Sequence, residues 1–122
     1  MSVSLEDAIE MTAKAKKLDH QLFAIAVDAM EAAFPDEDFS TAASLIGSEP
    51  VEAVLHLVDE HLPEWTISLR GKAREEDGDW KCILRKSSAR DNDALIGSGS
   101  GPTLALAVLE AILKASVIRA RM

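Results

Sequence analysis

The sequence predicts an α+β domain in which helices come first, a small antiparallel sheet follows and one helix closes the chain. Three observations lead to this fold class. In the first half, apolar residues recur at three- and four-residue spacing. Over residues 65–70 and 80–85 they instead alternate with polar residues. A glycine-rich segment then leads into a long apolar run. Helices grouped ahead of strands, with no regular strand–helix alternation, are typical of α+β proteins.

The first helix is expected to run from Leu5 to about Lys17. Ser4 stands where a helix N-cap is needed, and Asp7 follows three residues later in a capping-box-like pattern. Lysines gather toward the end of the segment, where positive charge is favourable at a helix C-terminus.

Two more helices are expected before the sheet. The first of them should run from Asp19 to Ala33, because an apolar stripe spans this segment and Pro35 ends it. The second should have Ser48 as its cap and Pro50 in its first turn. Between the two, residues 40–46 form either a short helix or an irregular turn.

Residues 65–70 and 80–85 are expected to form an antiparallel hairpin around the loop 71–79. A short, weak third strand is expected over residues 94–98. The sheet therefore has two or three strands, and the predicted order is αααββ(β)α within a single domain over residues 1–122.

The closing helix is expected to begin near Pro102, which suits a first-turn position. One of its faces should be apolar and cover the sheet. The predicted core combines this face with the helix stripes and one strand face; its members are Leu22, Ile25, Val54, Leu55, Val58, Trp65, Ile67, Trp80, Leu84, Leu104, Val108 and Ile112.

The other strand face is polar and cationic and is the best candidate binding surface. Arg70, Lys81 and Arg85 share it. A face of this kind is most often only solvated, and the alternative is a docking surface for an acidic partner, a second copy of the chain included. The chain carries a net charge of −8, yet residues 65–122 hold ten bases and seven acids. This charge asymmetry is the electrostatic indication of a partner surface.

Other candidate sites are weaker. The segment Gly97–Thr103 precedes a helix and could hold an anion, but it matches neither a dinucleotide fingerprint nor a P-loop, so structural turn chemistry is favoured. His56 and His61 are five residues apart and diverge on a helix, so no metal site is expected. Cys82, the one cysteine, is expected to be buried and inert.

Short stretches of the chain resemble a known group. The segments Leu62-Pro63-Glu64-Trp65 and Gly101-Pro102-Thr103-Leu104-Ala105 are similar to parts of the phage "ABA sandwich" domain proteins and their relatives in proteobacteria. The Pro102-Thr103 order is the reverse of theirs. The resemblance implies helices on both faces of a small antiparallel sheet, whereas one polar sheet face favours a two-layer fold. It implies no catalytic residues.

The functional expectation is a non-enzymatic, phage-related interaction module that acts through protein–protein contacts, self-association among them. The alternative is a nucleic-acid-associated accessory protein that uses the cationic hairpin, although the net charge makes nucleic acid the weaker partner. A third hypothesis is a phosphate or small-molecule binder at the glycine segment. No cofactor, metal or membrane is expected, and the absence of a signal-like N-terminus favours the cytoplasm.

Overall fold

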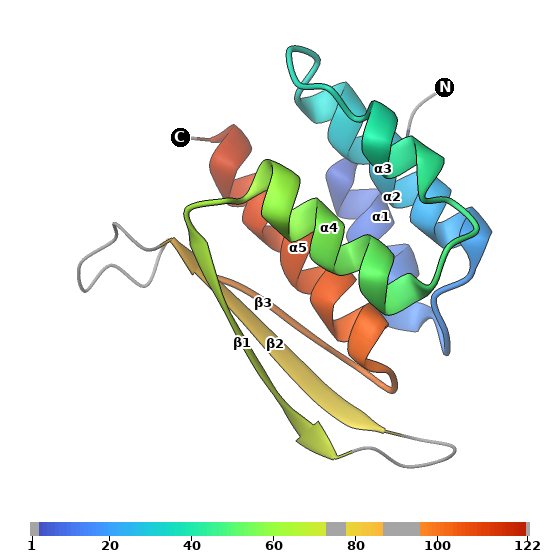
Figure 1. The fold of residues 1–122 in the computed structure, drawn as a ribbon. Coiled ribbons are helices and arrows are strands. Elements are labelled where there is room, and N and C mark those ends of the chain that lie inside the picture. Colours follow the sequence, from blue (N-terminus) through green and yellow to red (C-terminus); the bar gives the residue numbers. More distant parts are fainter. Residues whose placement is uncertain (1–2, 73–77, 87–95, 122) are drawn as a thin grey trace.

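The computed structural model describes residues 3–72, 78–86 and 96–121, which form a layer of helices packed on one face of a three-stranded antiparallel sheet (Figure 1). The predicted α+β class and element order are confirmed. The elements are α1 (Leu5–Lys14), α2 (His20–Ala33), α3 (Ser40–Ser44), α4 (Pro50–His61), β1 (Trp65–Lys72), β2 (Asp79–Lys86), β3 (Ile96–Gly101) and α5 (Leu104–Ala120).

Side-chain N-caps mark the starts of α1 and α2. Ser4 accepts a hydrogen bond from the Asp7 N–H at 3.1 Å, and Asp19 accepts one from the Leu22 N–H at 2.8 Å. The prediction that the first helix reaches Lys17 was wrong. The helix stops at Lys14 because the backbone turns extended at Ala15, and Leu18 is then buried before the next helix begins.

The predicted cap of the third long helix was also wrong. Glu49, not Ser48, is the N-cap of α4, and no side chain makes a cap hydrogen bond there. Pro50 supplies the first helical residue, which needs no N–H donor. Residues 40–44 form the short helix α3, one of the two predicted alternatives.

The sheet has the order β1-β2-β3, with antiparallel neighbours throughout. Ile67 pairs with Leu84 across β1 and β2, and Leu84 pairs with Gly97 across β2 and β3. The third strand exists and extends past Ser98 to Gly101; residues 94 and 95 fall outside the described part. Gly99 and Gly101, which the sequence places in a turn after the strand, are strand residues instead.

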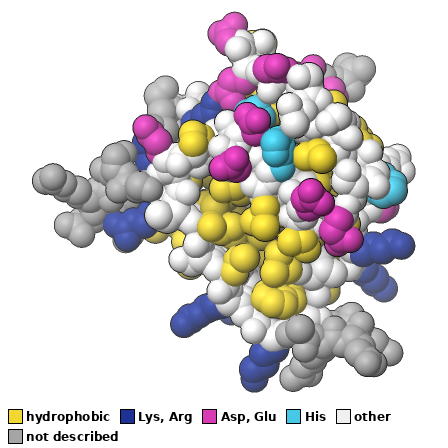
Figure 2. Space-filling model, in the orientation of Figure 1, with side chains coloured by type: hydrophobic (Ala, Val, Ile, Leu, Met, Phe, Trp, Pro, Cys, Tyr) yellow, Lys and Arg dark blue, Asp and Glu magenta, His cyan; other side chains and the backbone are white. Residues whose placement is uncertain are grey.

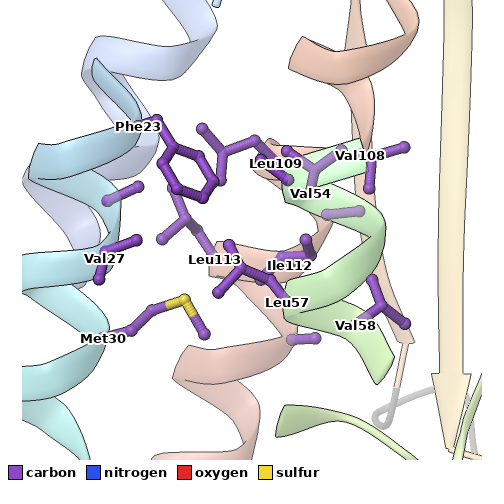
Figure 3. Packing of buried hydrophobic residues seen from close by; sticks show 14 of the residues in the cluster. Phe23, Val27, Met30, Val54, Leu57, Val58, Val108, Leu109, Ile112 and Leu113 are labelled. Carbon is purple, nitrogen blue, oxygen red and sulfur yellow. The ribbon is translucent and has the colours of Figure 1, made fainter. Parts of the chain in front are cut away.

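Helix α5 is the centre of the molecule. It packs on β3 and β2 with one side and meets α1, α2 and α4 with the others, so every residue from Ala105 to Leu113 is buried. Figure 3 shows side chains of α2, α4 and α5 meeting there, with Phe23, Leu57 and Leu113 among them. The prediction of a single buried face was therefore too narrow.

Part of the predicted core lies at the surface. Leu55 and Ile67 are 41% and 36% exposed, and Leu69, on the same strand face as Ile67, is 40% exposed. Ile67 and Leu69 do point to the helical side of the sheet, since their cross-strand partners Leu84 and Cys82 are fully buried. They stay exposed because α5 covers β2 and β3, and none of the described helices has extensive contacts with β1.

Three other predicted core residues, Ile25, Trp80 and Leu104, are half-buried, and the remaining ones are buried as expected. All the described helices lie on one side of the sheet (Figure 1). The helices implied on both faces by the resemblance are therefore not found in the described part of the structure. None of the described helices has the length and apolar character to cross a membrane.

Candidate functional site

The sheet surface turned away from the helices is the candidate site, called here the open face. Side chains of one parity on all three strands form it; they are Thr66, Ser68, Arg70, Lys72, Asp79, Lys81, Ile83, Arg85, Ile96, Ser98 and Ser100. Ile96 is half-buried and the others are exposed. The predicted residues Arg70, Lys81 and Arg85 therefore do share one accessible surface.

Strand register sets the arrangement of charge on the open face. Arg70 lies directly opposite Lys81, and Lys72 lies opposite Asp79. Like charges in direct cross-strand positions repel, so the Arg70–Lys81 pair favours a negative counter-charge from outside the sheet. Four cationic side chains and one carboxylate stand among the described residues of this face.

An apolar side chain lies among these charges. Ile83 is 44% exposed, and it pairs with Ser68 on one side and Ser98 on the other. The open face thus has an apolar centre with cations around it. Protein interfaces commonly have such an apolar centre with a polar rim.

A second feature surrounds His61, the last residue of α4, close to the start of β1. The His61 Nδ1 atom lies 3.0 Å from a carboxylate oxygen of Glu37, and Arg119 forms an ion pair with the other oxygen. Arg119 also donates to the His61 carbonyl oxygen at 3.0 Å. The Phe39 ring stacks on the imidazole with centroids 3.9 Å apart, and the Arg119 guanidinium lies 4.0 Å from the centroid of Phe34.

These contacts tie together three chain segments: the α2–α3 connection, the end of α4 and the end of α5. Beside them lies a hollow of about 480 Å³, whose wall includes Glu60, Glu64, Trp65 and Lys86. Glu37 and Arg119 neutralise each other's charge, and both contact His61. We call these three residues the polar joint, which fixes the turn from α4 into β1.

Burial determines the protonation state of His61 in this joint. The His61 side chain is almost fully buried, and burial holds its pKa below the usual value of 6.5. The carboxylates of Glu60 and Asp38 act in the opposite direction, but burial is the larger cause. The neutral imidazole is therefore the favoured form near neutral pH.

The glycine segment does not form the anion-binding loop considered from the sequence. Gly97 and Gly99 face the helical layer from within β3, and a Cβ at Gly97 would come within 2.7 Å of the Ala111 carbonyl oxygen. These glycines allow α5 to lie close against the strand. At the helix start, Thr103 is the N-cap and accepts from the Leu106 N–H at 3.2 Å.

The prediction of a buried cysteine is confirmed. Cys82 is buried, and burial raises the pKa of its thiol to about 11, so the thiolate needed for reactivity is scarce. The His56 Nε2 atom lies 3.7 Å from a carboxylate oxygen of Glu60, one helical turn along α4.

Sequence reasoning missed the joint around His61. Along the sequence, Glu37 is 24 residues and Arg119 is 58 residues away from His61, which both contact. No local spacing could indicate such a cluster. Comparison with known proteins adds no candidate, because no family model, curated protein or solved structure matches this chain. The resemblance to the phage proteins stays a prediction.

Proposed function

We propose that the protein is an interaction module whose open face binds an acidic protein partner. The observation that carries this proposal is the exposed Arg70–Lys81 pair in direct cross-strand position on a sheet face that no described element covers. An acidic surface would relieve the repulsion within this pair and add favourable contacts to both side chains.

Three features favour a protein over a nucleic acid as the partner. Ile83 stands at the centre of the face and suits an apolar contact. Moreover, the described residues of the open face include no aromatic side chain on which a base could stack. The net charge of −8 also opposes general attraction to a polyanion.

Charge reversal with a matched control tests the proposal. The test variant is Arg70→Glu with Lys81→Glu, and the control is Lys16→Glu with Lys17→Glu, an equal charge change at the exposed α1–α2 junction. Binding of labelled polyglutamate and of duplex DNA is measured at low salt. We expect polyglutamate affinity to fall roughly tenfold or more in the open-face variant and to stay near native in the control.

Equal polyglutamate binding by the native chain and both variants would overturn the proposal. Stronger binding of the duplex, with an affinity that falls steeply as salt rises, would establish the nucleic-acid alternative in its place. As a second readout, proteins captured from a lysate by the native chain and the control should be missing from the open-face variant.

A further inference from the structure

The two edges of the sheet differ. At the β3 edge, the Ser100 N–H donates to the buried Glu110 carboxylate at 2.9 Å. At the β1 edge, the described part of the chain provides no pairing element beyond β2. Strand β1 is eight residues long, contains no proline and pairs in unbroken register with β2. An edge of this kind presents unpaired N–H and C=O groups and invites another strand.

An apolar opening runs beside this edge. Ile67 and Leu69 face it from β1. The exposed Leu55 lies about 200° around α4 from Ala53, on the side away from the small pocket that Ala53 and Phe23 line. Figure 2 shows hydrophobic side chains gathered in the space between α4 and β1. Exposed apolar area next to a free strand edge favours a partner that covers both.

We propose that the occupant of this edge is a second copy of the chain, whose own β1 adds in antiparallel orientation with Ser68 on the two-fold axis. This register sets Ile67 against Leu69 of the partner subunit, and Trp65 against Gly71 of the partner subunit. The apolar side chains of both copies then meet on the helical side and close both openings.

Charge complementarity favours this register over one displaced toward the end of β1, and it favours a second copy as the partner. With Ser68 on the axis, Glu64 lies opposite Lys72 of the partner subunit, and the two-fold symmetry makes that pair twice. A shift that placed Gly71 on the axis would set Arg70 against Lys72 of the partner subunit, and like charges in direct opposition are destabilising. The edge is therefore complementary to itself, as a two-fold interface requires.

The dimer would have one continuous six-stranded sheet made from two three-stranded ones. Residues that face each other across an antiparallel seam point to the same side of the sheet. Both open faces consequently lie together and form one larger cationic surface, while both helical layers lie on the other side. The proposal rests on the β1 edge and does not depend on what the open face binds.

Sedimentation velocity of the full chain tests the interface. Lysine on an edge strand blocks pairing, so Ile67→Lys should convert a native dimer to a monomer. The control is Ile83→Lys, an equal change at a slightly more exposed isoleucine on central strand β2 and the opposite face. It should leave the dimer intact. A native chain that stays monomeric at about 100 μM, or a dimer that persists in Ile67→Lys, would overturn the proposal.

Cysteine cross-linking tests the register without relying on a destabilised variant. Ser68→Cys should form an intermolecular disulfide under mild oxidation, because residues on the axis face their own copies within bonding distance. Thr66→Cys is the matched control on the same face and should cross-link several-fold more slowly. The native Cys82 is buried and does not compete. Faster cross-linking through Thr66→Cys would overturn this register.

Discussion

At the scale of single residues, Gly97 and Gly99 of β3 allow the sheet and the central helix α5 to pack closely. A Cβ at Gly99 would collide with the Ala107 carbonyl oxygen and lie 2.6 Å from the Ala111 backbone nitrogen. Both obstacles belong to the backbone of α5, which cannot move aside as a flexible side chain can. At Gly101 the nearest atom is the Leu106 Cβ at 3.2 Å.

This difference predicts that Gly99→Ala lowers the free energy of unfolding by about 3 kcal/mol, because the strand must move away from the helix. Gly101→Ala should cost less than about 1 kcal/mol, since a small side-chain shift makes room. Urea denaturation followed by tryptophan fluorescence measures both. Equal losses in the two variants would contradict the close approach of α5 to β3 at Gly99.

At the scale of elements, α5 is buried on all sides because it packs against the sheet and three other helices. Such a helix carries few polar groups, and those it has are paired. The Ser116 hydroxyl donates to the Ile112 carbonyl oxygen at 2.8 Å. Glu110 is 6% exposed, accepts from the Ser100 N–H and lies 3.7 Å from the Lys114 ammonium. Through Glu110, the helix protects the β3 edge of the sheet.

We expect Glu110→Ala to lower the free energy of unfolding by about 1–2 kcal/mol, because the Ser100 N–H loses its acceptor in a partly buried place. Glu110→Gln keeps a side-chain oxygen and should lose clearly less. Chemical denaturation of both variants, with amide hydrogen exchange at Ser100, makes the comparison. If the glutamine variant were as unstable as the alanine variant, the hydrogen bond would not be the cause.

At the scale of the whole molecule, the joint around His61 holds the ends of α4 and α5 to the α2–α3 connection. The lowered pKa of His61 makes the stability of the fold depend on pH. Because burial keeps the pKa of folded His61 below 6.5, the unfolded chain binds more protons between the two values. The contribution is complete above about pH 6.5 and is lost as the pH falls through the folded-state pKa.

We therefore expect the native chain to lose stability from pH 7 toward pH 5 more steeply than the variant His61→Gln, which cannot titrate. The comparison variant His20→Gln removes an exposed histidine at the start of α2, away from the joint. Thermal unfolding across this pH range measures the slopes. A steeper slope in His61→Gln than in the native chain would show that His61 does not have a lowered pKa.

Within single elements, the sequence was a good guide. Ser4 and Asp19 marked helix starts, because a cap acts on N–H groups only two or three residues away. The alternation through Trp65 and through Leu84 predicted strands for the same reason, since successive side chains of a strand point to opposite faces. The placement of Arg70, Lys81 and Arg85 on one face followed from this parity alone.

The predictions that were wrong or missing concern contacts between residues far apart in the sequence. Alternation showed that Ile67 faces the helical side, but whether a helix lies over it depends on where α5 settles, some forty residues later. The glycines of β3 suggested a loop because their value as close-packing residues exists only against α5. The contacts between Glu37, His61 and Arg119 join segments that no local spacing connects.

The sequence by itself thus determined the fold class, most helix and strand positions and the cationic parity of the sheet, because short-range sterics, caps and side-chain alternation set these properties. Only the tertiary structure decided that α5 is central, that β1 keeps a free apolar edge and that His61 is buried in a polar joint. Those properties depend on which elements lie across from one another, and long-range packing of the whole core settles that arrangement.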